Sequence, residues 1–150
     1  MAGTFTSLTY HLIFSTKNRE PWIAHEMESR LWSYMAGIAL EQGMIPLKIG
    51  GMPDHVHAPV AIPPTLLVSK ALQLMKGPSS KWIHETYPKM RGFAWQDGYG
   101  AFTVGRSQVV NVIKYIERQR EHHRTKTFQE EFLAFLKRYE IAYDPKYIWG

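Results

Sequence analysis

The stretch that organises the chain reads PDHVHAPV and covers residues 53–60. Side chains alternate between the two faces of a β-strand, so His55 and His57 are predicted to share one face, while Val56 and Val60 point into a core on the other. Two neutral imidazoles on one face can bind a divalent metal ion, although two ligands alone make a weak site. The same pattern also arises by chance in a chain with seven histidines, so a third ligand from elsewhere is needed.

Composition indicates one folded domain over residues 1–150. Apolar residues make up 45% of the chain and aromatic residues 13%, enough for a core at this length. We expect neither a signal peptide nor a membrane span, because no basic start precedes an apolar run and no apolar run is long enough. Cysteine is absent, which excludes disulfides, thiol catalysis and zinc–thiolate sites and fits a cytoplasmic protein.

The net charge and the aromatic content indicate what kind of molecule the protein could bind. A formal charge of +5, with five Trp, eight Tyr and seven Phe, suits a nucleic acid, because cations meet phosphates and rings stack on bases. A soluble basic protein that keeps its aromatic residues in the core would have the same composition.

Hydrophobic periodicity predicts the elements of the first half. Alternation predicts a strand over 5–15, and helical spacing predicts a helix over 25–42 that Gly43 ends. A short strand over 45–49 and a tight connection at 50–53 lead into the histidine strand, 54–62. An amphipathic helix then begins at Thr65 and ends at Gly77-Pro78.

Five polar residues at the predicted ends of elements are candidate DNA contacts. Ser79 is predicted to begin a new helical turn, where free backbone N–H groups can hold a phosphate, or where it simply caps the helix. Cations near strand and helix ends could meet phosphates or lie in solvated loops. The candidates are Lys17, Arg19, Lys76, Ser79 and Lys81.

The second half supplies one more strand and two helices. Asp97-Gly98 is a turn signal before a strand that ends at Val104, and Ser107 is predicted to cap a helix over 108–123 with a buried stripe of Val and Ile. Thr127 and Glu130 form a capping-box pattern that opens a last helix. The order of elements matches the α+β, ferredoxin-like βαββαβ plan followed by two helices. The aromatic tail, 143–149, should pack on its own domain or on a partner subunit.

Tyr115 and Gln119 lie four residues apart on the predicted helix and therefore on one face. Gln119 offers a neutral oxygen that could complete a metal site begun by two histidines. Tyr115 offers a phenol, which can attack phosphorus if nearby cations lower its pKa from about 10. The basic and ring-nitrogen neighbours are Lys114, Arg118, Arg120, His122, His123 and Arg124.

At this point the sequence resembles the single-tyrosine HUH transposases, the small TnpA-type enzymes of bacterial insertion sequences, together with their domesticated relatives associated with palindromic repeats. The resemblance runs in order along the chain. Its motifs are YHLIFSTKNR at 10–19, GMPDHVH at 51–57, KGxSSKW at 76–82, WQxGYGAF at 95–102 and YIxxQxxHH at 115–123.

The resemblance implies an activity and a set of roles. His55 and His57 match the HUH pair, Gln119 the third ligand of Mg²⁺ or Mn²⁺, and Tyr115 the nucleophile. It implies cleavage and rejoining of single-stranded DNA at hairpin-bearing ends through a 5′-phosphotyrosine. It also implies a homodimer in which the tyrosine helix of one subunit faces the histidine strand of the other.

The chain departs from the family pattern at one place, and several other functions stay open. The family usually has large aliphatic residues after the second His, whereas this chain has Ala58-Pro59, and Pro favours an edge strand or a bulge. A domesticated enzyme that nicks repeat hairpins would carry the same motifs. A ferredoxin-like nucleic-acid-binding module without chemistry, or a metal hydrolase that activates water, would also accommodate the histidines.

Overall fold

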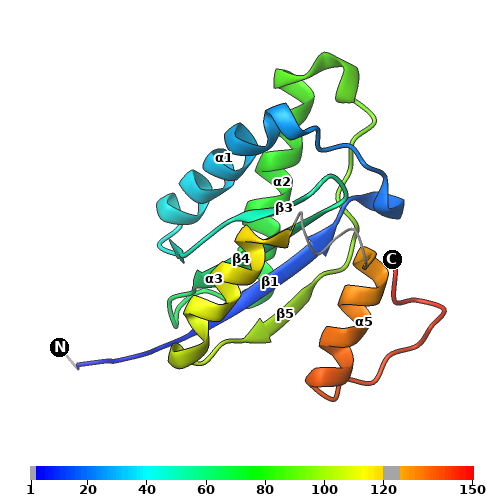
Figure 1. The fold of residues 1–150 in the computed structure, drawn as a ribbon. Helices are drawn as coiled ribbons and strands as arrows, with labels where there is room; N and C mark the ends of the chain where they lie inside the picture. Colours follow the sequence, from blue (N-terminus) through cyan, green and yellow to red (C-terminus); the bar gives the residue numbers. More distant parts are fainter. Residues whose placement is uncertain (1–2, 120–125) are drawn as a thin grey trace.

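The computed structural model describes residues 3–119 and 126–150. Its centre is an antiparallel sheet in which β4 lies between β1 on one side and β2 and β3 on the other, while β5 pairs with the far edge of β1 (Figure 1). This strand order confirms the predicted α+β, ferredoxin-like plan. The strands are β1 Thr9–Ser15, β2 Ile45–Pro46, β3 Gly50–Met52, β4 His55–Ala61 and β5 Gly100–Thr103.

Helices cover both faces of the sheet. The larger core lies between one face and α1 (Glu28–Glu41) and α2 (Val68–Thr86). A smaller core lies on the other face beneath α5 (Phe128–Arg138), and α3 (Val109–Glu117) crosses β3 and β4 on that side (Figure 1). Single 3₁₀ turns connect these elements at Lys17–Arg19, His25–Met27, Pro88–Met90 and Arg106–Gln108. No helix in the described parts of the chain has the length and apolar character needed to cross a membrane.

Strand alternation divides β1 and β4 between the two cores. Leu12 and Phe14 of β1 and Val56 of β4 are buried in the larger core. Ile13, one position along, is buried in the smaller core. His55 and His57 therefore lie on the face that α3 and α5 cover, as the alternation predicted. The first strand is shorter than expected and begins at Thr9.

Pro59 lies within a central strand, although proline favours an edge strand or a bulge. The carbonyl of Pro59 accepts a hydrogen bond from the Leu47 N–H at 2.9 Å. The N–H and C=O of one residue point to the same neighbour in an antiparallel pair. The missing N–H of Pro59 therefore faces residues 47–49, where β2 has ended and β3 has not begun. Strand β4 runs through Pro59 without a break.

The predicted connection at 50–53 is also wrong, because Gly50–Met52 forms β3 and only Pro53-Asp54 turns the chain. A Cβ on Gly51 would come within 2.1 Å of the His55 carbonyl oxygen, and one on Gly50 within 2.5 Å of Ile116 Cγ2. These glycines permit close approach within the sheet and beneath α3.

The helix predicted to end at Gly77-Pro78 continues instead to Thr86, with Pro78 inside α2. Gly77 has no Cβ to clash with the Pro78 ring, which lowers the steric cost of a helical residue before proline. The buried face of α2 also continues on both sides of the proline, through Ala71, Leu72, Met75, Ser79 and Ile83. The predicted caps at Thr65 and Ser107 are not formed, since α2 begins after Leu67 and α3 after Gln108.

The C-terminal region packs on its own domain. Thr127 and Glu130 form the predicted capping box at the start of α5. The Trp149 ring lies 6.1 Å from that of Phe132, and the Gly150 carbonyl accepts a hydrogen bond from Gln96. Within the stripe predicted for α3, Ile116 is buried and the other members are half-buried. The helix predicted to reach residue 123 is seen as α3 to Glu117, and residues 120–123 lie outside the described chain.

Candidate active site

The site begins with two buried histidines of β4, on the face of the sheet beneath α3 and α5. His55 Nδ1 lies 2.6 Å from the Asp54 carboxylate, and His57 Nδ1 lies 2.7 Å from Nε2 of His11 on β1. A partner at Nδ1 fixes the orientation of each ring and directs its Nε2 atom toward α3 and α5. The strand thus presents two oriented ring nitrogens on one face.

The region after α3 brings the Gln119 side chain to the histidines. Its amide nitrogen lies 2.8 Å from His55 Nε2, and its amide is buried. The Gln119 Oε1 atom is buried without a hydrogen-bond partner among the described residues. The two amide orientations differ only by exchange of O and N. A reversed amide would place the oxygen, a metal-binding atom, against His55.

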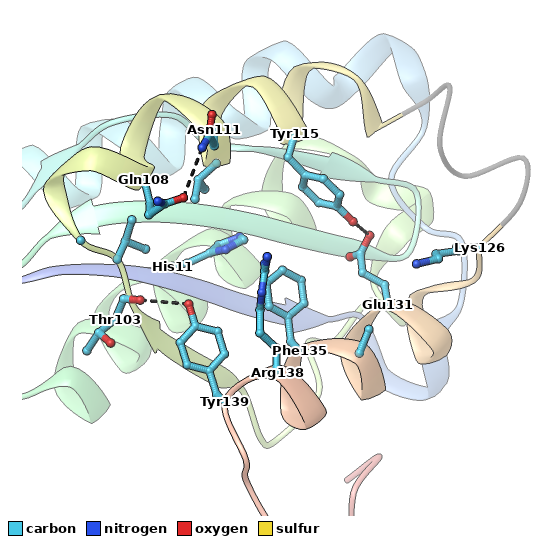
Figure 2. Close-up of a pocket in the computed structure, with 14 residues that line it drawn as sticks. His11, Thr103, Gln108, Asn111, Tyr115, Lys126, Glu131, Phe135, Arg138 and Tyr139 are labelled. Carbon is cyan, nitrogen blue, oxygen red and sulfur yellow. Dashed lines mark hydrogen bonds between the residues drawn. The ribbon is translucent and has the colours of Figure 1, made fainter.

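Glu131 of α5 joins these groups and was not predicted. One carboxylate oxygen lies 2.7 Å from His57 Nε2 and 3.5 Å from His55 Nε2. The other accepts a hydrogen bond from the Tyr115 hydroxyl (Figure 2). The sequence did contain a signal for Glu131. It lies three residues after Phe128 and four before Phe135, so it occupies a position on the buried face of the last helix.

The donor set fits a divalent metal ion. Single ligand atoms of His55, His57 and Glu131 all lie within 4.8 Å of one another. Imidazole, carboxylate and amide oxygen are suitable ligands for Mn²⁺, and the oxygen donors suit Mg²⁺. The unpartnered Gln119 oxygen is explained if its amide turns to complete such a site.

Burial controls the protonation of this cluster. Desolvation lowers the pKa of His11 well below its ordinary value and also lowers that of His55. Both rings are therefore held neutral, which is the form that binds metals or accepts hydrogen bonds. Burial raises the pKa of the Tyr115 phenol, and the neighbouring Glu131 charge and hydrogen bond raise it further. Attack by a phenolate would be favoured if nearby cations lowered the pKa of Tyr115, and the described surroundings shift it in the opposite direction.

One chain supplies every group named above. The Tyr115 ring centre lies 5.7 Å from that of His57 in the same chain. Sharing the site between two subunits would therefore require them to exchange α3. Arg120, His122, His123 and Arg124, which we expected near Tyr115, lie outside the described residues.

The five candidate DNA contacts differ in their surroundings. Lys17 is exposed just after β1, and Arg19 places its guanidinium 5.4 Å from the centre of the Trp149 ring. The Lys76 ammonium donates to the Gln96 carbonyl at 2.6 Å and to that of Gly98 at 2.9 Å. Lys81 is exposed on α2.

Ser79 corrects one of these hypotheses. It is fully buried inside α2, where its hydroxyl donates to the Met75 carbonyl at 2.6 Å and accepts from Trp95 Nε1 at 3.0 Å. The predicted phosphate site required a helix that begins at Ser79. Because the helix continues through this position, its backbone N–H groups are not those of a helix start.

A ferredoxin-like sheet with buried histidines opposite a helical tyrosine defines a class of protein. Similarity to known proteins shows which family that is. Residues 4–119 match the family described as "Transposase IS200 like", and the chain belongs to this family of DNA-processing enzymes. It is 28% identical over 124 residues to the ISDra2 transposase TnpA of Deinococcus radiodurans, covering 79% of this chain and 89% of the relative. It is also 28% identical over 127 residues to the IS200 transposase of Salmonella typhimurium, covering 81% and 82%.

Solved structures support the same fold. A crystal structure from Deinococcus radiodurans, described as a transposase, superposes with a TM-score of 0.66 at 27% identity, covering 79% of this chain and 95% of that one. The structure of a REP-associated tyrosine transposase bound to a REP hairpin superposes with a TM-score of 0.60, covering 82% and 72%. Its identity of 13% makes that second likeness one of fold alone.

Proposed function

We propose that this transposase cleaves and rejoins single-stranded DNA at hairpin-bearing ends, with Tyr115 as the nucleophile and a 5′-phosphotyrosine as the intermediate. The observation that supports the proposal is the position of the Tyr115 hydroxyl. It shares the Glu131 carboxylate with His57, so a nucleophile and a metal-binding cluster meet at one point in one chain.

The metal-binding residues in this proposal are His55, His57 and Gln119, joined by Glu131. Their nitrogen and oxygen donors suit Mg²⁺ or Mn²⁺. Bound there, the ion would supply Lewis-acid polarisation of the scissile phosphate.

The chain's own groups account for the covalent step. Tyr115 Oη would form a bond to phosphorus while the bond from phosphorus to the leaving 3′ oxygen breaks. The phenol proton would pass to Glu131, which already accepts its hydrogen bond, and the leaving 3′ oxygen would take a proton from solvent. A second 3′-hydroxyl would then attack the phosphotyrosine and form a bond to phosphorus while the bond from phosphorus to Tyr115 Oη breaks. The proton of that hydroxyl would pass to solvent, and Glu131 would return a proton to the Tyr115 oxygen.

The proposal includes the partners that the sequence motifs imply. The substrate would be single-stranded DNA with a hairpin beside the cleavage position, and two copies of the chain would act as a homodimer. The protein's formal charge of +5 suits such a substrate. Light scattering of the protein with and without hairpin DNA would measure the stoichiometry directly.

Covalent trapping tests the nucleophile. The protein is mixed with labelled single-stranded hairpins taken from the flanks of its own gene, in MgCl₂, MnCl₂ or EDTA, and run on a denaturing gel. We expect a metal-dependent adduct that Tyr115→Phe abolishes while hairpin binding persists. The matched control is Tyr143→Phe, which changes an exposed tyrosine of the C-terminal segment and should leave the adduct intact.

The other outcomes separate the alternative functions. Cleavage that survives Tyr115→Phe would indicate a hydrolase that uses activated water. Tight hairpin binding by the unaltered protein, with neither cleavage nor adduct in any metal, would indicate a binding module without chemistry.

A further inference from the structure

A cavity of about 750 Å³ lies between α3 and α5 and opens beside the nucleophile (Figure 2). Tyr115 and Glu131 border it at one end, and Gln108 and Tyr139 line it farther along. Its size is in the range of pockets that enclose small molecules, which suits one or a few unpaired nucleotides rather than a duplex. We call this cavity the strand cleft.

We propose that the strand cleft binds the unpaired nucleotides adjoining the phosphate that Tyr115 attacks. This inference rests on the proposed function, because it takes Tyr115 as the attacking group. A phosphorus atom within bonding distance of Tyr115 Oη has its neighbouring nucleotides within one backbone repeat of the hydroxyl. Tyr115 itself lines the strand cleft.

The charges that line the strand cleft are complementary to a DNA backbone. Arg138 and Lys126 contribute cations, and both are exposed to solvent. The one carboxylate among the described lining residues is Glu131, which is buried against His57 and Tyr115. Phosphates entering the cleft would therefore meet cations along its solvent-facing rim.

The remaining lining groups suit unstacked bases. The rings of Phe135, on α5, and of Tyr139, directly after it, line the cleft, and aromatic faces stack on bases of any sequence. On the α3 side, the Asn111 amide donates to the Gln108 side-chain oxygen at 3.2 Å. This bond uses one donor and one acceptor, so each amide keeps further polar groups for a base edge.

The strand cleft depends on residues beyond the matched family region. The family match covers residues 4–119, whereas Lys126, Phe135 and Arg138 follow it. We infer that α5 contributes to substrate binding in addition to carrying Glu131.

Binding of fluorescein-labelled octathymidylate tests the strand cleft without the need for a known target sequence. Arg138→Ala should weaken binding and reduce the slope of log affinity against log salt by ~0.7, the value expected for one phosphate contact on a single strand. The matched control is Lys137→Ala, which removes the same charge from the neighbouring exposed residue of α5, outside the cleft. The Lys137→Ala variant should retain more affinity than Arg138→Ala does, and most of the salt dependence of the unaltered protein.

Photocrosslinking supplies a second readout that does not depend on cleavage. The Tyr115→Phe protein is irradiated with octathymidylate carrying one 5-iododeoxyuridine, and the crosslinked peptides are identified by mass spectrometry. We expect crosslinks in peptides that contain Phe135 or Tyr139. Equal binding by the Arg138→Ala and Lys137→Ala variants, or crosslinks confined to other peptides, would overturn the proposal.

The two proposals can fail separately. A covalent adduct at Tyr115 together with crosslinks outside the strand cleft would retain the nucleophile and reject the cleft. Crosslinks in the cleft without an adduct from the unaltered protein would retain a strand-binding surface and reject the phosphotyrosine mechanism.

Discussion

At the scale of single residues, each histidine of the site is oriented by a neighbouring side chain that contacts its Nδ1 atom. Asp54 holds His55, and His11 holds His57, each through the ring nitrogen that points away from the cluster. His11 is buried on β1 and was predicted only as part of an alternating strand. Such outer partners commonly change metal affinity or activity by 10–100-fold when they are removed. His11 therefore acts as a positioning residue for His57.

The buried histidines predict how stability depends on pH. Folding lowers the pKa values of His11 and His55, whereas histidines of the unfolded chain titrate near 6.5. Below that pH the unfolded state binds protons that the folded state does not. Stability should therefore fall as the pH drops below about 6.5, by up to ~1.4 kcal/mol per pH unit for each histidine.

Urea unfolding of metal-free protein between pH 7.5 and pH 5.5 measures this dependence. His11→Asn should reduce the slope in this range, because one buried imidazole is lost. The control is His25→Asn, since the His25 side chain is 76% exposed, and it should leave the slope close to that of the unaltered protein. A stability that is flat or rises on acidification would contradict the prediction.

At the scale of elements, β3 determines how closely α3 approaches the histidine strand. Ile116 of α3 packs directly over Gly50, where a Cβ would come within 2.5 Å of its Cγ2 atom. Tyr115 precedes Ile116, and Gln119 follows three residues later. The height of α3 above the sheet therefore sets the positions of the proposed nucleophile and of one proposed metal ligand.

We predict that Gly50→Ala lowers both the rate of cleavage and the free energy of unfolding. The added methyl displaces α3 outward because the branched Ile116 side chain has little rotational freedom. Overpacking of this kind costs about 1–3 kcal/mol, and a displacement near 1 Å at a catalytic group can lower the rate ~100-fold. Single-turnover cleavage and urea unfolding of the same samples measure both effects.

Gly37→Ala is the matched control for Gly50→Ala. Gly37 lies inside α1, and a Cβ there would meet nothing within 4 Å. This variant should be more stable, by about 0.5–1 kcal/mol, because alanine is the better helix residue, and its cleavage rate should be unchanged. A Gly50→Ala protein that cleaves at the unaltered rate would show that α3 does not depend on this contact.

At the scale of the whole molecule, the candidate site joins three elements that are distant in sequence. His55 and His57 lie on β4, Gln119 follows α3, and Glu131 lies on α5. The smaller core holds α5 against the sheet through Ile13 and through Phe102, Phe128, Phe132 and Leu136. A metal ion bound by these groups would connect the β4 strand to both C-terminal helices.

Mn²⁺ should therefore stabilise the folded chain. At a free concentration 100 times the dissociation constant, binding adds ~2.7 kcal/mol. For a domain of this size, that energy corresponds to an increase of roughly 5–10 °C in the melting temperature. Thermal unfolding followed by circular dichroism in MnCl₂ and in EDTA measures the shift.

Glu131→Gln provides the control for the metal prediction. It keeps the size of the side chain and removes the charge that faces both histidines, so Mn²⁺ should raise the melting temperature of this variant less. Equal melting temperatures of the unaltered protein in MnCl₂ and EDTA would contradict metal binding at this cluster.

The sequence by itself determined the features that depend on neighbouring residues. Alternation placed His55 and His57 on one face, and Thr127 with Glu130 marked the start of the last helix. These patterns are local because strand and helix periods act over a few residues. The order of elements then restricted the fold to one plan.

Only the tertiary structure decided which distant segments meet. Helix α2 continues through Pro78 because its buried face lies on the sheet, and Gly50 forms a strand because it pairs with His57 of β4. Glu131 and His11 joined the site through the packing of α5 on the sheet and the pairing of β1 with β4. Contacts between segments depend on the register and packing of the complete chain, which short-range periodicity does not specify.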